Sequence, residues 1–228
     1  PQLSSKEDIL KSRCTASLIS TKWVLSAAHC FFNNKNRPIA AKGILIVAGT
    51  TNFLNTSNSY SQEREAKEVY IHPKFKPLLS MHDIALVKVD PFELNKFISL
   101  IPLKQSPLPL NTQVGCVAVG WGDTDASTST SKLHKLRVFG EQSERACPGM
   151  DQEEVSRLVC LKQEPGRGLC DGDSGSPLIC AGQLTGIAHE VYAIVPPLNP
   201  DPKMECGENG LTMTYIFVAL TWIGSSNM

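Results

Sequence analysis

The apolar residues of this 228-residue chain occur in short runs, and this pattern strongly constrains the fold. Runs of about five residues, rich in Val, Ile and Leu, alternate with clusters of Gly, Asn and Pro. The clearest runs cover residues 44–48, 84–89, 116–119, 177–180 and 184–188. Such runs are typical of strands in a β-barrel or sandwich, and only the C-terminal end suggests a helix. The sequence therefore predicts an all-β protein with a short C-terminal helix.

The charge is balanced, with 22 Lys and Arg against 22 Asp and Glu, so the formal net charge is zero. The chain therefore has no long-range field that would attract nucleic acid or an acidic membrane. Its densest basic stretch, residues 35–42, is better explained as a solvated loop than as an anion-binding patch. The apolar stretch 211–224 is too short to span a bilayer. Neither a nucleic-acid partner nor membrane insertion is expected.

Eight cysteines, an even number, indicate disulfides and an oxidising compartment. Zinc binding is disfavoured because the sequence has no CxxC pair and no Cys/His cluster at ligand spacing. Residues 1–4 are polar and lack the features of a signal peptide, as expected for a mature or excised segment. Asn55 begins a glycosylation sequon in a polar loop. These features favour a secreted glycoprotein.

Three motifs carry the chemistry: Ser174 in a Gly-Asp-Ser-Gly turn, His29 in Ala-Ala-His-Cys and Asp83 in Asp-Ile-Ala-Leu. A serine hydroxyl needs an adjacent base to act as a nucleophile near neutral pH, and histidine titrates in that range. A buried carboxylate can hold the imidazole in one tautomer and stabilise its charge. Glycine beside the serine lets the amides of Gly172 and Ser174 point at one oxyanion.

The order of these motifs resembles the trypsin/chymotrypsin family of serine endopeptidases, and further segments follow in family order. They are SLISTKWVLSAAHCF, VYIHPKF, HDIALVKV, VGCVAVGWG and ALTWI. The resemblance implies two six-stranded antiparallel Greek-key barrels and a short C-terminal helix in a single domain, 1–228. Barrel one would cover about 1–105 and barrel two about 106–228, with the crossover near residues 101–109. The site would lie in the cleft between them.

The resemblance also implies roles for individual residues. Ser174 would be the nucleophile, His29 the general base and acid, Asp83 the orienting carboxylate, and the Gly172 and Ser174 amides the oxyanion hole. The implied disulfides are Cys14–Cys30, Cys116–Cys180, Cys147–Cys160 and Cys170–Cys206. The other isolated histidines, His72, His82 and His134, lack such neighbours and are interpreted as structural. No cofactor is implied.

The N-terminal region departs from the family pattern. In active members, a new Ile-Val-Gly-Gly terminus pairs with the aspartate before the nucleophile, here Asp173, and orders the oxyanion loop. Only residues 1–28 precede His29, and Pro1-Gln2-Leu3 resembles the start of the family's next strand. Either the sequence is an excerpt or the protein lacks the activating terminus.

The substrate pocket departs as well. Gly168 stands where trypsins have an aspartate, so cleavage after Lys or Arg is not expected. The family's Ser-Trp-Gly pocket wall is replaced by His189, Glu190 and Val191. Val would narrow the pocket mouth, Glu would remove an apolar platform, and His189 would replace a serine that bonds the triad aspartate. A shallow or closed pocket that excludes benzamidine is therefore predicted.

Two loops near the expected site leave alternatives open. Residues 192–205 form a proline-rich insertion that is either a neutral surface excursion or a lid or partner-recognition loop. Residues 52–65 cover the family's calcium loop, but their acidic residues cluster at one end, so no bound metal is expected.

Two functions follow from these features. The first is a secreted, monomeric endopeptidase of narrow, non-tryptic specificity that acts on protein or peptide substrates through an acyl-enzyme. The alternative is a weakly active or inactive protease-like protein that binds a protein partner through an occluded pocket. A lipase or esterase is disfavoured, since their Gly-x-Ser-x-Gly enzymes place the histidine last, whereas His29 comes first here.

Overall fold

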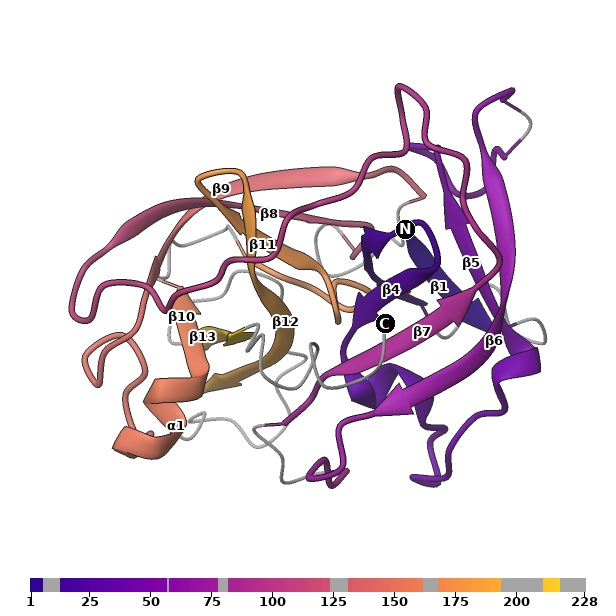
Figure 1. Cartoon of the computed structure of the whole chain (residues 1–228). Coiled ribbons are helices and arrows are strands. Elements are labelled where there is room, and N and C mark those ends of the chain that lie inside the picture. Colours follow the sequence, from indigo (N-terminus) through magenta and orange to yellow (C-terminus); the bar gives the residue numbers. More distant parts are fainter. Residues whose placement is uncertain are drawn as a thin grey trace.

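The computed structural model consists of two antiparallel β-barrels that lie side by side (Figure 1). It describes residues 1–5, 13–56, 58–77, 82–123, 131–161, 168–193 and 211–217. The all-β class and the two-barrel architecture expected from the sequence are confirmed. Among the described residues, no helix is long and apolar enough to cross a membrane.

The first barrel is a seven-stranded sheet in the order β2-β1-β5-β6-β7-β4-β3. Its strands are β1 (Gln2–Ser5), β2 (Arg13–Thr15), β3 (Ser17–Ser20), β4 (Trp23–Ser26), β5 (Ile44–Ala48), β6 (Gln62–Ile71) and β7 (Ala85–Val89). The count exceeds the expected six because β2 and β3 are consecutive segments separated by Ala16 alone. They occupy opposite ends of the sheet order, so this short break is what separates the sheet from a closed barrel.

The second barrel is closed and has six strands in the order β10-β13-β12-β11-β8-β9. They are β8 (Val114–Gly120), β9 (His134–Glu141), β10 (Leu158–Leu161), β11 (Pro177–Cys180), β12 (Gln183–Ala193) and β13 (Leu211–Phe217). Inward-facing residues such as Cys116, Ala118, Val159 and Leu178 form its apolar core. Closure removes exposed strand edges, which otherwise have unpaired backbone groups.

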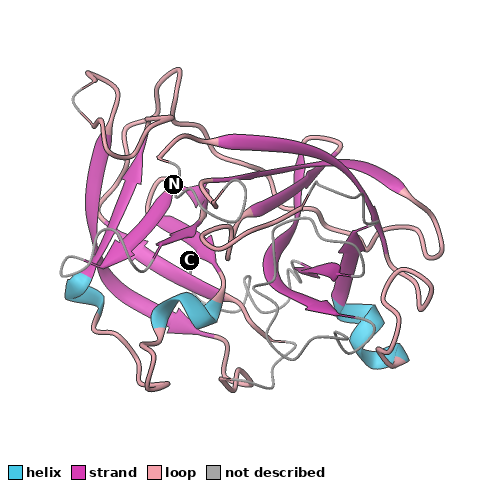
Figure 2. Cartoon of the chain, turned by 180° about the vertical axis from the view of Figure 1, so that it is seen from behind, coloured by secondary structure: helices cyan, strands magenta, loops and turns pink. Residues whose placement is uncertain are grey.

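The helices among the described residues are short and lie in the connections between strands (Figure 2). They are the 3-10 turns η1 (Ala28–Phe31) and η2 (Ala41–Gly43) and the helix α1 (Gln152–Arg157). In α1, Asp151 accepts from the Glu154 amide at 2.9 Å while the Glu154 carboxylate accepts from the Asp151 amide at 2.8 Å. This capping box satisfies backbone donors at the helix start. The expected C-terminal helix lies outside the described residues.

The two barrels share an apolar interface. Leu25 and Leu86 of the first barrel belong to the same buried cluster as Leu158, Leu184 and Ile187 of the second. The chain between β7 and β8 contacts both barrels. The Ile101 amide donates to Leu18 O at 3.1 Å, and the Lys104 amide donates to Leu184 O at 2.9 Å. The relative position of the barrels is therefore held by buried side chains and by the crossover backbone.

Disulfides tie neighbouring elements together. Three pairs implied by the resemblance are present: Cys14–Cys30, Cys116–Cys180 and Cys147–Cys160. Cys170 is also disulfide-bonded, and its expected partner, Cys206, lies outside the described residues. The Cys14–Cys30 bond links β2 to η1, which carries His29.

Candidate active site

His29 lies in η1, immediately after β4 and beside the Cys30 disulfide. Asp83 lies just before β7, and β7 pairs with β4, so sheet pairing brings the two residues together. The backbone amide of His29 donates to Asp83 Oδ1 at 2.7 Å, and the ring Nδ1 lies 2.6 Å from Asp83 Oδ2. These two contacts fix both the carboxylate and the plane of the imidazole.

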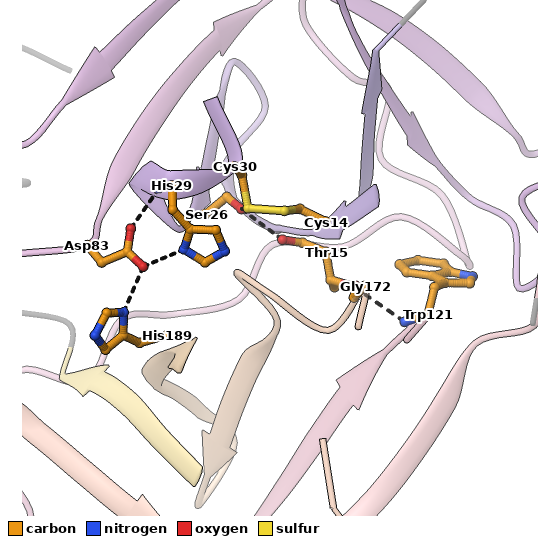
Figure 3. The surroundings of a disulfide bond; sticks show 9 residues. All are labelled: Cys14, Thr15, Ser26, His29, Cys30, Asp83, Trp121, Gly172 and His189. Atoms are coloured by element: carbon orange, nitrogen blue, oxygen red, sulfur yellow. Dashed lines mark hydrogen bonds and ion pairs between the residues drawn. A yellow bond between two sulfur atoms is a disulfide. The ribbon is translucent and has the colours of Figure 1, made fainter. Parts of the chain in front are cut away.

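A second imidazole shares the same carboxylate oxygen. His189 Nδ1 lies 2.8 Å from Asp83 Oδ2, and both rings point at this oxygen in Figure 3. His189 reaches it from a bulge in β12, since Ala188 pairs with Tyr215 and Glu190 with Thr214, leaving His189 unpaired between them. A bulge redirects a side chain, which is what this contact requires.

The protonation of the cluster follows from its burial and hydrogen bonds. The Asp83 side chain is only 1% exposed; burial alone would raise its pKa, but the hydrogen bonds from His189 and His29 outweigh burial and lower it. An ionised carboxylate only accepts hydrogen bonds, so both Nδ1 atoms must carry hydrogen. Neutral His29 therefore has its lone pair on Nε2, which is the form that a general base needs.

Burial and nearby charge have opposite effects on the pKa of His29. Burial favours the neutral ring, whereas the hydrogen bond to Asp83 and the charges of Asp83 and Glu190 favour the cation. The net effect raises the pKa of His29 above its ordinary value. A raised pKa makes the ring a stronger base at neutral pH.

Ser174 lies in a turn held between the two barrels. Its carbonyl accepts from the Thr15 amide of the first barrel at 2.8 Å, and the next amide, of Gly175, donates to Ala188 O of β12 at 2.9 Å. Gly175 has φ +74°, and a Cβ there would lie 2.1 Å from Ser26 Oγ, so only glycine fits. Among the described residues, no hydrogen bond joins the Ser174 hydroxyl to His29.

Gly172 and Ser174, whose amides are expected to form the oxyanion hole, lie in the same turn. Gly172 has φ +93°, a conformation that favours glycine. Asp171 O accepts from the Asp123 amide at 2.8 Å. Because a trans peptide directs C=O and N–H to opposite sides, the Gly172 amide points away from Asp123. Within the described part of the chain, neither the Gly172 nor the Ser174 amide donates a hydrogen bond, so both are available to a ligand.

Asp173, the residue expected to receive an activating ammonium, binds backbone amides. Its carboxylate accepts from the Gly122 amide at 2.9 Å and from the Cys170 amide at 3.0 Å. Burial raises its pKa despite these two bonds. Pro1 is held elsewhere, with its carbonyl accepting from the Ala16 amide at 2.7 Å. The ion-pair role of Asp173 therefore stays a prediction.

The expected pocket-wall residues lie consecutively on β12. Glu190 pairs with Thr214 and Val191 with Met213 of β13, and this pairing continues to Ala193 opposite Leu211. The beginning of the expected insertion thus extends a β-hairpin, while residues 194–205 lie outside the described residues. Gly168 precedes the half-buried Cys170 turn. The openness of the pocket stays a prediction.

Sequence reasoning missed two supports of the Ser174 turn. Thr15 Oγ1 donates to Gly172 O at 3.3 Å and accepts from the Trp121 amide at 3.4 Å (Figure 3). Gly120 and Gly122 leave room for the Asp173 carboxylate, because a Cβ at either position would lie within 2.3 Å of an Asp173 side-chain atom. The Gly-Trp-Gly segment at residues 120–122 could have been recognised from the sequence as a support of this turn. Thr15 could not, because it belongs to no motif.

Comparison with known proteins decides the family. The family model described as Trypsin matches residues 2–199. The chain belongs to the trypsin family. It is 31% identical to Trypsin-1 of Salmo salar over 193 aligned residues. The alignment covers 82% of this chain and 74% of the relative. It is also 31% identical over 195 residues to Serine protease 1 of Rattus norvegicus, covering 82% and 73%.

A solved structure supports the same fold. A mutant of human heparin binding protein superposes with a TM-score of 0.76, covering 98% of this chain and 89% of that chain. The sequence identity is 21%, so this likeness concerns the fold. His29, Asp83 and Ser174 of this trypsin family member thus lie within a two-barrel fold that the solved structure shares.

Proposed function

We propose that this trypsin family member is a secreted serine endopeptidase of narrow, non-tryptic specificity. The observation that carries this proposal is the site geometry. His29 has its Nδ1 bound to the buried Asp83 carboxylate, and the amides of Gly172 and of Ser174 itself donate no hydrogen bond within the described residues. A site kept only as a remnant would not need both the hydrogen-bonded base and the unpaired oxyanion donors.

The proposed reaction follows the acyl-enzyme route. His29 Nε2 takes the Ser174 hydroxyl proton as Oγ attacks the peptide carbonyl, and the Gly172 and Ser174 amides stabilise the oxyanion. The imidazolium returns that proton to the leaving amine as the C–N bond breaks. Water, deprotonated by the same ring, then hydrolyses the acyl ester and regenerates Ser174. Asp83 stabilises the imidazolium throughout and stays ionised.

The proposed specificity rests on the residues around the pocket. Gly168 supplies no carboxylate to bind a Lys or Arg side chain, so a small or medium apolar residue is the expected substrate. Glu190 and Val191 on β12 replace the Trp and Gly of the family wall, and we expect them to narrow the entrance. A monomer is expected, and Asn55 is exposed in its loop, as glycosylation requires.

A protease-like binding protein is the second candidate, and two observations favour it. The hydroxyl of Ser174 makes no hydrogen bond to His29 among the described residues, and β12 pairs with β13 as far as Ala193. A wall extended in this way can restrict substrate access while the triad persists. The structural neighbour's name likewise describes binding rather than hydrolysis.

Peptide-library cleavage by the secreted protein with its native N-terminus separates the candidates. The endopeptidase proposal predicts cleavage after small or medium apolar residues, abolished in Ser174→Ala and insensitive to millimolar benzamidine. Glu144→Ala, an exposed position away from the site, serves as the matched control and should cleave normally. Absence of cleavage by a correctly folded wild type would favour the binding protein, and cleavage after Lys or Arg would contradict the proposed specificity.

A further inference from the structure

The side chains of His29, Asp83 and His189 bring three metal-ligand atoms together. One ligand atom from each residue lies within 4.8 Å of the other two, and both Nδ1 atoms contact Asp83 Oδ2. Two imidazoles and one carboxylate, with a fourth position left for water, are a donor set of zinc sites. We propose that this cluster is a zinc site, and that zinc bound there inactivates the protease.

Admitting the ion requires both ring nitrogens to move apart from Asp83 Oδ2. Zinc ligands lie about 2.0–2.2 Å from the metal, so neighbouring atoms of a tetrahedral site are roughly 3.4 Å apart. The existing separations from Asp83 Oδ2 are 2.6 Å to His29 and 2.8 Å to His189. Each must therefore open by roughly 0.6–0.8 Å. The His29 side chain is 39% exposed, so protein atoms do not surround its ring on every side.

The surroundings also suit a cation. His189 Nε2 lies 3.6 Å from Glu190 Oε2. When zinc takes Nδ1, the ring hydrogen moves to Nε2 and can be donated to Glu190, which is the usual outer partner of a zinc-bound histidine. Asp83 and Glu190 together supply two negative charges, which balance Zn²⁺. The His29 amide holds Asp83 Oδ1 and leaves Oδ2 as the ligand atom.

Zinc at this site would block the proposed reaction directly. With the metal on Nδ1, the neutral His29 ring carries its hydrogen on Nε2 and cannot accept the Ser174 proton. This consequence rests on the proposed function, whereas metal binding does not. The other group of close ligand residues, Cys14, Cys30 and His29, has its two sulfurs in a disulfide and offers no thiolates. The sequence disfavoured zinc because it has no Cys/His cluster at ligand spacing, and this proposal departs from that expectation: His29, Asp83 and His189 come together only in the fold.

Calorimetric titration of the secreted protein with zinc chloride tests the site. We expect one equivalent to bind, with at least about 10-fold weaker binding in His189→Asn and about 10-fold weaker binding in Glu190→Gln. Asn is a matched replacement because its amide can still donate to Asp83. His72→Gln, which alters the separate stacked pair His72 and His82, should bind zinc as the wild type does.

A second measurement follows Ser174. Zinc should slow its labelling by a fluorophosphonate, EDTA should restore the rate, and His189→Asn should be insensitive to zinc. The proposal is overturned if micromolar zinc does not bind, if His189→Asn binds it as tightly as the wild type, or if only His72→Gln loses binding. A wild type that is never labelled would refute the proposed function, while the calorimetry would still decide the metal site.

Discussion

Asp83 accepts three hydrogen bonds from two histidines, and these bonds influence the protonation of His29 and Asp83. The buried carboxylate and the more distant Glu190 both favour the charged form of His29. Since only the neutral ring can act as a base, activity should rise with pH as His29 loses its proton. The acid limb of the rate profile is therefore expected above the ordinary histidine value of 6.5.

Glu190→Gln tests this electrostatic contribution. Removing its negative charge should lower the pKa of His29 and move the acid limb of kcat/KM to lower pH, without abolishing activity. The measurement is a pH profile of peptide hydrolysis. Glu144→Gln, an exposed change elsewhere on the second barrel, should leave the limb in place. A limb that moves to higher pH in Glu190→Gln would contradict the account.

At the scale of elements, strand β8 has two glycines with opposite surroundings. A Cβ on Gly120 would lie 2.0 Å from Asp173 Oδ1, whereas a Cβ on Gly115 would have nothing within 4 Å. The end of β8 therefore determines where the Asp173 carboxylate, and hence the Ser174 turn, can lie.

Gly120→Ala should displace that carboxylate from the Gly122 amide. We expect a loss of about 1–3 kcal/mol in the free energy of unfolding from overpacking. We also expect Ser174 labelling to slow by at least 10-fold, since a misplaced oxyanion donor costs about 10²–10³ in rate. Gly115→Ala on the same strand should change stability by less than about 0.5 kcal/mol. Equal effects of the two substitutions, measured by denaturation and labelling, would refute this role of β8.

The elements also show what sequence could and could not predict. The runs 44–48 and 177–180 coincide with β5 and β11, as expected for short apolar segments bounded by turn residues. The family resemblance placed His189 where a serine bonds Asp83, but the bulge in β12 that aims the ring depends on β12–β13 pairing, whose register local sequence does not specify. Thr15 supports Gly172 through a contact between residues 157 positions apart, which no local pattern reveals.

At the scale of the whole molecule, a histidine pair and an arginine link the barrels. His72 stacks on His82 with ring centroids 4.7 Å apart, and Arg157 Nη1 of α1 lies 2.8 Å from His82 Nε2. A guanidinium group only donates hydrogen bonds. Nε2 of His82 must therefore accept, so it carries no hydrogen and the ring is neutral. Burial, together with repulsion from Lys74 and from His82 whenever that ring is protonated, lowers the pKa of His72 from 6.5 to about 4. Burial and Arg157 also lower the pKa of His82.

This pair should make stability depend on pH. The unfolded chain binds protons more readily than the folded one, so the contribution is complete above pH 6.5 and is lost as the pH falls towards about 4. Urea denaturation at pH 7 and pH 4.5 should show this loss in the wild type and a smaller loss in His72→Gln/His82→Gln. The same pH dependence in both proteins would contradict the assignment.

The disulfides provide another whole-molecule test. Cys116–Cys180 joins positions 64 apart and Cys147–Cys160 positions 13 apart. Loop-closure entropy predicts a loss of about 4 kcal/mol for Cys116→Ala/Cys180→Ala and about 3 kcal/mol for Cys147→Ala/Cys160→Ala. Denaturant unfolding of the two double variants gives the comparison. A larger loss from opening the shorter loop would show that loop-closure entropy does not dominate.

The central claim is that His29, oriented by Asp83, activates Ser174 as a nucleophile, and that the Gly172 and Ser174 amides stabilise the oxyanion formed by its attack. Intact-mass analysis of the secreted protein after treatment with a fluorophosphonate tests it most directly. The account predicts one adduct per molecule, located on Ser174 by peptide mapping, formed faster as pH rises through the His29 titration, and absent from Ser174→Ala and His29→Ala. A folded wild type that remains unmodified, or an adduct at any other residue, would contradict it.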